Sequence, residues 1–175
     1  MGFKREILSI FLMVIIFMPI GYYLAGKVVY NGVAHTNTDC WGNFDQNTPE
    51  HFAPLRSEVP LNESNNSENI SSDIMEGLSQ YWWPGYENAT IEVEGLFLSA
   101  WYLRQNDSMP WVILVHGIRG CKSDGALLIP SGMLANAGFN VIVFDLRDHG
   151  ESSIDDNRVS GGQDEWKDVV AVFDW

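Results

Sequence analysis

Two short runs of apolar, mostly β-branched residues stand out along the chain, Trp111–Val115 and Asn140–Phe144. Each run ends abruptly at polar and glycine residues, which is typical of a strand buried on both faces of a parallel sheet. Between them, Pro130 suits the first turn of a helix and Gly138 suits the position just after its end. The order strand, helix, strand predicts an α/β fold with its chemistry at the carboxyl ends of the strands.

The helix between these strands is expected to face the sheet with Met133, Leu134 and Ala137. Upstream, residues 90–94 alternate between apolar and polar side chains, Gly95 permits a turn, and the apolar run Leu96–Leu103 follows. This pattern predicts an antiparallel β-hairpin.

The last residues of the chain have the apolar periodicity of an amphipathic helix, at Trp166, Val169, Val170 and Phe173. No Gly, Asn or other helix-end signal follows before Trp175. We therefore expect the chain to be a fragment of a larger domain. Its sheet is expected to end on an open strand at residues 140–144, which would favour aggregation.

Residues Ile7–Gly26 are almost entirely apolar, and about 20 such residues span the hydrocarbon core of a membrane. Lys4 and Arg5 precede them, which favours a single-pass membrane protein with a cytoplasmic N-terminus and the rest of the chain on the exterior side. A cleaved signal peptide is the alternative. It requires a shorter apolar region and a small-x-small cleavage site, which residues 23–25 supply poorly.

Residues 31–72 are rich in Asn, Ser, Thr, Glu and Pro and show no sustained period, which predicts a stalk or loose linker. Ser71 or Ser72 could cap a short helix through Tyr81. The predicted organisation is a cytoplasmic N-terminus at residues 1–6, a transmembrane signal anchor at 7–26, an Asn- and Ser-rich exterior linker at 27–83, and a truncated α/β domain at 84–175.

The chain carries a formal net charge of −13, an acidic balance that repels nucleic acid and excludes it as an expected partner. Its two cysteines, Cys40 and Cys121, could pair in an oxidising compartment. Cys40 lies in the irregular segment, however, and Cys121 follows the candidate site. These positions favour two unpaired thiols.

A strand that ends in His116-Gly117, followed by a helix and a strand that ends in Asp145-x-Arg-x-His-Gly-x-Ser152, resembles the first half of the α/β-hydrolase superfamily. The resemblance is closest to its serine aminopeptidase-like and membrane-anchored esterase-like branch. It extends from about Pro84 to Trp175, with residues 87–102 as the opening hairpin. The sequence departs from the family pattern at Asp148, where a glycine is common.

The resemblance implies acyl transfer by a serine nucleophile, with backbone N–H groups stabilising the oxyanion. Ile118 would supply one such N–H from the loop after the strand. Gly117 would let the backbone approach the substrate, and His116 would orient the loop rather than act as a base. The implied substrate is a small-molecule carboxylic ester or, as an alternative, a peptide or amide. No cofactor is expected, and the histidines show no metal-ligand spacing.

No Gly-x-Ser-x-Gly motif occurs in the chain. The contexts of Ser131 and Ser160 lack the flanking glycines and do not follow an apolar strand. The polar cluster from Asp145 to Ser152 is interpreted as structural, because Ser152 lies too close in sequence to His149 for a nucleophile elbow. The serine, acid and histidine of the triad are thus not in this chain, and we expect the fragment to be catalytically incomplete.

Two other function classes stay open. A strand that ends in Asp145 after a glycine loop also outlines a Rossmann-type dinucleotide-binding oxidoreductase, in which the carboxylate would bind ribose hydroxyls. Gly117-x-x-Gly120 does not fit the glycine pattern of that fold. The other class is a membrane-tethered exterior protein without catalysis, which the buried-strand pattern from Trp111 onward disfavours.

Overall fold

The computed structural model describes residues 2–36, 47–52 and 76–175, and the chain divides into two compact units, Met1–His35 and Thr36–Trp175. The first unit contains a single helix, α1 (Gly2–Ala34). Within it, Phe11–Ala34 is apolar over 24 residues, a rise of about 36 Å. The length and composition of α1 are sufficient to cross a hydrocarbon core of about 30 Å.

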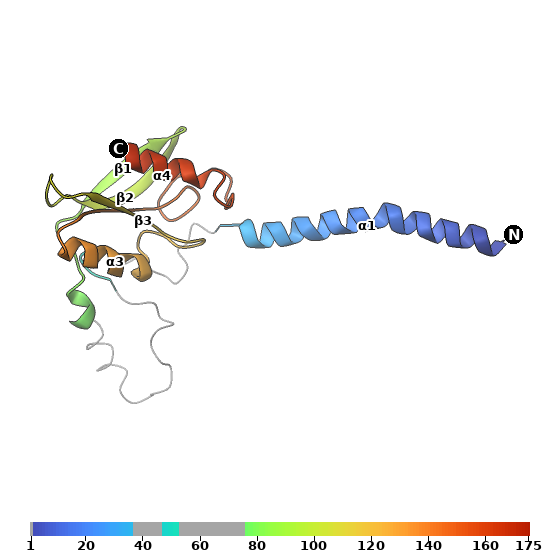
Figure 1. Ribbon diagram of the computed structural model, residues 1–175, viewed down its shortest axis with the longest axis horizontal. Coiled ribbons are helices and arrows are strands. Elements are labelled where there is room, and N and C mark those ends of the chain that lie inside the picture. Colours follow the sequence, from blue (N-terminus) through green and yellow to red (C-terminus); the bar gives the residue numbers. More distant parts are fainter. Residues whose placement is uncertain (1, 37–46, 53–75) are drawn as a thin grey trace, which may run out of the picture. The chain divides into compact units, whose positions relative to one another are not determined.

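The second unit contains a mixed four-stranded sheet in the order β1-β2-β4-β3 (Figure 1). Its strands are β1 (Glu87–Val93), β2 (Leu96–Leu103), β3 (Trp111–Val115) and β4 (Asn140–Phe144). β1 and β2 form the predicted hairpin, and Glu94 and Gly95 at its turn both have positive φ, 51° and 83°. β4 pairs antiparallel with β2 and parallel with β3.

The expectation that residues 140–144 form the open edge of the sheet is wrong. β4 lies between β2 and β3, and all five of its residues are buried. The edge strands are β1 and β3, and in β3 Trp111 and Val115 are exposed by 43% and 40%. The physical reason is that β4 is apolar on both faces, so burial on both faces and strand pairing on both sides favour it for the central position.

Two helices cover opposite faces of the sheet, α3 (Gly125–Asn136) and α4 (Glu165–Asp174) (Figure 1). Alternate residues of β4 point to the two faces. Val141 and Val143 belong to the core cluster that contains residues of α3, whereas Ile142 and Phe144 belong to the cluster that contains residues of α4. The carboxyl ends of the parallel pair β3 and β4 therefore lie side by side between the two helical layers.

α3 begins earlier than the position of Pro130 suggests. Asp124 is its N-cap, and the side chain accepts the Ala126 N–H at 2.9 Å. Leu134 packs against the core as expected, but the other two residues of the expected face do not, because Met133 is 54% exposed and Ala137 is exposed. The residues that face inward are Leu127, Leu128, Ser131, Gly132 and Ala135. The end of the helix is as predicted, with Gly138 at a φ of 90°.

Two pieces of the expected linker pack into the second unit. Phe52 and Trp83 are buried in the core cluster that also contains residues of α3. The Trp83 N–H donates to the Pro49 carbonyl at 2.9 Å. A Cβ on Gly132 would overlap the Tyr81 carbonyl, so this glycine lets the segment approach α3. Residues 76–79 are helical, whereas the predicted cap at Ser71 or Ser72 lies outside the described residues.

Candidate active site

Two loops meet at the carboxyl ends of the parallel strands, the β3 loop (residues 116–124) and the β4 loop (residues 145–153). Ile118 in the β3 loop is 64% exposed, and its backbone N–H has no hydrogen-bond partner among the described residues. No described atom lies within 4 Å of the position that a Cβ on Gly117 would occupy. The β3 loop thus presents an unpaired donor beside open space.

His116 connects the β3 loop to the β4 loop and is 7% exposed. Its Nδ1 lies 2.8 Å from the Gly117 carbonyl oxygen, which can only accept, so Nδ1 carries the proton. Its Nε2 accepts the Leu146 N–H at 3.1 Å. Because both ring nitrogens are engaged, the imidazole is neutral and has no free nitrogen to act as a base.

His149 makes the reciprocal connection from the β4 loop. Its Nδ1 donates to the Arg147 carbonyl at 2.8 Å, and its Nε2 accepts the Arg119 N–H at 3.3 Å. Arg119 has a φ of 62°, so this bond supports a strained, left-handed residue next to Ile118. The His116 and His149 rings lie 4.8 Å apart, centroid to centroid. The backbone around Ile118 is therefore held on both sides by a histidine side chain.

This geometry predicts a loss of stability in mild acid. Burial, followed by the charge of the neighbouring His149, lowers the pKa of His116 from its ordinary value of 6.5. Because the unfolded chain then binds more protons, this contribution to stability is complete above pH 6.5 and falls as the pH decreases below it. We expect the urea concentration at the midpoint of unfolding to decrease when the pH is lowered from about 7.5 to about 5.5. This interval lies above the range in which carboxylates titrate.

The matched variant for that measurement is His116→Asn, which removes the titrating ring. Its urea midpoint should change less than that of the unmodified chain over the same interval. An equal pH dependence in both proteins would show that His116 does not control it.

Asp145, at the end of β4, is 1% exposed and fully bonded to the protein. Its carboxylate accepts the Lys122 N–H at 2.6 Å, the Lys122 Nζ at 2.8 Å and the Glu151 N–H at 3.0 Å. It therefore has no free face for ribose hydroxyls. Together with the antiparallel pairing of β2 and β4, this burial contradicts the dinucleotide-binding interpretation.

Three serines, Ser152 of the β4 loop and the two in the rejected motifs, are engaged by the protein. Ser152 is 6% exposed, and its Oγ donates to the Asp145 carbonyl at 2.6 Å and accepts the Ser99 N–H at 2.9 Å. The Ser131 hydroxyl donates to the Leu127 carbonyl at 2.7 Å, and the Ser160 hydroxyl contacts the Glu165 carboxylate. None of the three has a histidine among these partners, as an activated nucleophile requires.

Asp148, where the family pattern has glycine, has a φ of 63°. Its Oδ1 accepts the backbone N–H groups of Asp155, Asp156 and Asn157 at 2.7, 3.2 and 2.9 Å. The carboxylate thus organises the turn at residues 155–157, and these bonds offset the left-handed backbone. The sequence gives no signal that Asp148 would hold this turn.

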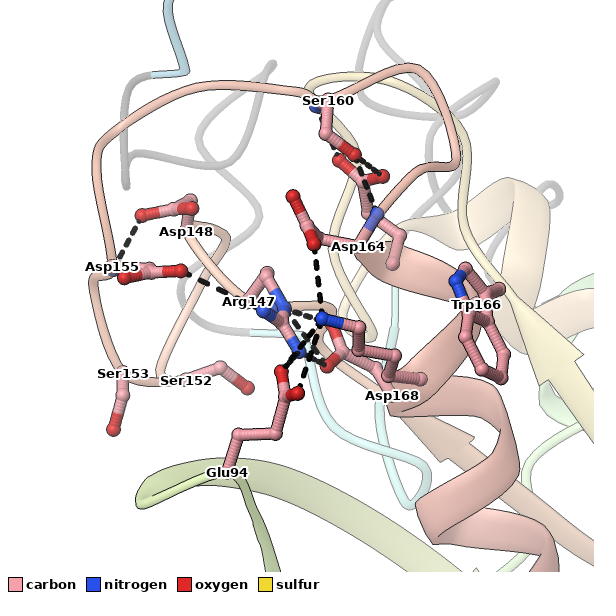
Figure 2. Close-up of polar contacts among 12 residues, drawn as sticks. Glu94, Arg147, Asp148, Ser152, Ser153, Asp155, Ser160, Asp164, Trp166 and Asp168 are labelled. Atoms are coloured by element: carbon pink, nitrogen blue, oxygen red, sulfur yellow. Dashed lines mark hydrogen bonds and ion pairs between the residues drawn. The ribbon is translucent and has the colours of Figure 1, made fainter.

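A buried ion pair missed by the sequence analysis ties the β4 loop to α4 (Figure 2). The Arg147 Nη2 lies 2.8 Å from the Asp168 Oδ1, and the two side chains are 4% and 0% exposed. Glu94, at the β1–β2 turn, accepts from the same nitrogen at 3.3 Å. These carboxylates raise the pKa of Arg147, and the largest cause is the set of hydrogen bonds that its guanidinium donates to Asp168.

α4 therefore turns a different face inward from the apolar stripe seen in the sequence. Asp168 and Val172 are buried, whereas Trp166 and Phe173 are 56% and 77% exposed. The pairing of Asp168 with Arg147, a residue distant in sequence, fixes this orientation.

Cys121 in the β3 loop is disulfide-bonded, which contradicts the expectation of free thiols. The sequence has one other cysteine, Cys40, which lies outside the described residues. Nearby, the Asn47 side chain donates to the Ser123 carbonyl at 3.1 Å. The β3 loop is thus also attached to residues far upstream in the sequence.

Within residues 2–36, 47–52 and 76–175, no group of three or more His, Cys, Asp or Glu side chains is arranged to hold a metal ion.

No protein-family model matches the chain, and no curated protein does. Among solved structures, it is similar to a Pyrococcus furiosus esterase, at 26% identity and a TM-score of 0.45 over 51% of this chain and 34% of the esterase. It is also similar to a haloalkane dehalogenase from Agrobacterium tumefaciens, at 18% identity and a TM-score of 0.43 over 55% of this chain and 30% of the enzyme. A third similar structure is a bacterial membrane phospholipase A, at 16% identity and a TM-score of 0.38 over 97% of this chain and 40% of that protein. The chain thus spans between 30% and 40% of their lengths.

Proposed function

We propose that this chain is the N-terminal part of a membrane-anchored serine hydrolase of the α/β-hydrolase type, acting on carboxylic esters or, alternatively, peptides or amides. The observation that carries the proposal is the unpaired Ile118 N–H at the end of β3, within the strand order β1-β2-β4-β3. In acyl transfer, an N–H at this place in the fold stabilises the oxyanion of the tetrahedral intermediate.

The edge strand supports the same proposal. β3 has no second partner among the described strands, and Trp111 and Val115 expose apolar surface along it. We propose that the strand bearing the catalytic serine pairs with β3, which places that serine beside the β3 loop. The serine, acid and histidine of the triad then come from residues other than these 175. "Whole enzyme" below means the polypeptide that combines them with this chain.

The proposed location is a membrane-anchored exterior domain with a cytoplasmic N-terminus. Lys4 and Arg5 precede the apolar part of α1, which favours that orientation. A disulfide at Cys121 fits an oxidising compartment outside the cytoplasm. A membrane-tethered domain without catalysis would fit these two features equally well, but it leaves the open Ile118 donor without a role.

Activity measurements on two proteins test the proposal. The 175-residue chain, purified in detergent, should hydrolyse p-nitrophenyl butyrate no faster than buffer, because its histidines 116 and 149 are engaged and Ser152 is buried. The whole enzyme should turn the ester over and lose that activity after treatment with an alkyl phosphonate. Turnover by the short chain that disappears in Ser152→Ala would contradict the proposal.

A further inference from the structure

Lys122 is a buried cation in the β3 loop, with a side chain 2% exposed. Its Nζ lies 2.8 Å from the Asp145 Oδ2, 2.6 Å from the Glu151 Oε2 and 4.7 Å from the centroid of the Trp101 ring. Lysine is almost never fully buried unless it is paired, because its charge loses hydration. The sequence analysis gave this residue no role.

We propose that Lys122 is a positioning residue that fastens the β3 loop, and with it the Ile118 N–H, to the end of β4. The importance of Ile118 rests on the function proposed above, whereas the fastening itself does not. The Lys122 backbone N–H also donates to the Asp145 Oδ1 at 2.6 Å, so one residue holds both oxygens of one buried carboxylate. Such charge-assisted bonds are stronger than neutral ones.

Two hydrogen bonds of the loop near Ile118 are weaker than the charge-assisted bond between Lys122 and Asp145. Gly120 donates to the Gly117 carbonyl at 3.0 Å within the same turn, and the Arg119 N–H reaches His149 at 3.3 Å. Both are bonds between neutral groups. The Lys122 side chain adds a charged attachment of the β3 loop to the end of β4, next to the Cys121 disulfide.

The receiving end of this attachment is rigid. Asp145 follows a fully buried strand, and the Glu151 N–H donates to its carboxylate at 3.0 Å. A Cβ on Gly150 would overlap that carboxylate, so a glycine is needed for the β4 loop to close around it. Loss of the Lys122 side chain should therefore loosen the β3 loop, which keeps the Lys122 N–H bond and the Cys121 disulfide, and leave the end of β4 in place.

Amide hydrogen exchange of the 175-residue chain tests this proposal without substrate. We compare Lys122→Met with Lys167→Met, a matched control in which the lysine also contacts two carboxylates, those of Glu94 and Asp164 at 3.1 Å. Lys122→Met should raise exchange of the Arg119 and Gly120 amides, which are hydrogen-bonded to His149 and Gly117, at least about tenfold, read by NMR, while the β4 amides change little. Lys167→Met should leave the loop amides unchanged.

Two results would overturn the proposal. One is unchanged loop exchange in Lys122→Met, and the other is a rise of equal size in β4, which is expected of a lysine that contributes only to global stability. If Lys122→Met does not fold, the double variant Lys122→Met/Asp145→Asn removes both charges from the interior. It should still show faster exchange at Arg119 and Gly120, and protection equal to that of the unmodified chain would refute the role of Lys122.

The exchange measurement tests the role of Lys122, and the activity measurement tests the proposed function, so either proposal can be refuted without the other. A whole enzyme that keeps full activity without the Ile118 N–H would refute the proposed function, and faster loop exchange in Lys122→Met would still support the fastening. Unchanged exchange, combined with activity that depends on the Ile118 N–H, would refute only the role of Lys122.

Discussion

Replacing Arg147 by Met should lower the free energy of unfolding by about 3–5 kcal/mol, because it leaves the Asp168 carboxylate charged and without its ion-pair partner in the interior. Asp168 is 0% exposed, and three of its four hydrogen bonds come from the Arg147 side chain. The remaining one comes from the Arg147 backbone N–H at 2.9 Å. Urea unfolding of the chain in detergent, followed by circular dichroism, measures the loss.

Arg104→Met is the matched control, because it removes an arginine from an ion pair that water surrounds. The Arg104 and Asp107 side chains are 61% and 79% exposed, so the change should be within about 1 kcal/mol. Equal losses in the two variants would show that the Arg147–Asp168 pair is not the buried link between the β4 loop and α4 that the structure shows.

Replacing Ile118 by Pro should reduce the kcat of the whole enzyme by about 10²–10³-fold, the usual effect of removing one oxyanion donor. Proline has no backbone N–H, and the substitution leaves every other residue of the β3 loop unchanged. The value of KM should change much less, because the bond is stronger in the transition state than in the ground state.

Ile118→Ala is the control for that experiment, because it keeps the backbone N–H and removes the exposed side chain. Its kcat should stay within a few-fold of the unmodified enzyme, and circular dichroism should show that both variants are folded. Equal kcat values in Ile118→Pro and Ile118→Ala would rule out the proposed donor.

The strands and the hairpin could be predicted from the sequence because their signals are local. Apolar runs that end at glycine or polar residues marked β3 and β4, and Gly95 marked the hairpin turn. The open edge was assigned to the wrong strand because strand order depends on which strand lacks a second neighbour. Strand order is a property of the whole sheet. The burial of all five residues of β4 agrees with its central position.

The predicted helices were correct in existence but not in the face that they bury. For α3 a local signal was present, since Asp124 stands directly before an apolar run and caps the helix. For α4 no local signal existed, because Asp168 is buried through its bonds to a residue of the β4 loop. Long-range ion pairs of this kind cannot be read from helical periodicity.

The candidate site was predicted in outline. Ile118 has the open N–H and His116 the loop-binding geometry that the resemblance implied, while their roles in catalysis stay predictions. Lys122 and Asp148 were missed because their importance comes from burial beside distant backbone groups. Charged residues in loops are usually solvated, so their sequence positions gave no reason to place them inside.

The central claim is that the Ile118 N–H binds the oxyanion, and a crystal structure of the whole enzyme inhibited by an alkyl phosphonate tests it most directly. The phosphonyl oxygen bound to the catalytic serine mimics the oxyanion. Our account predicts that this oxygen lies about 2.7–3.1 Å from the Ile118 nitrogen. A phosphonyl oxygen directed to other donors, with the Ile118 nitrogen beyond hydrogen-bond distance, would contradict it.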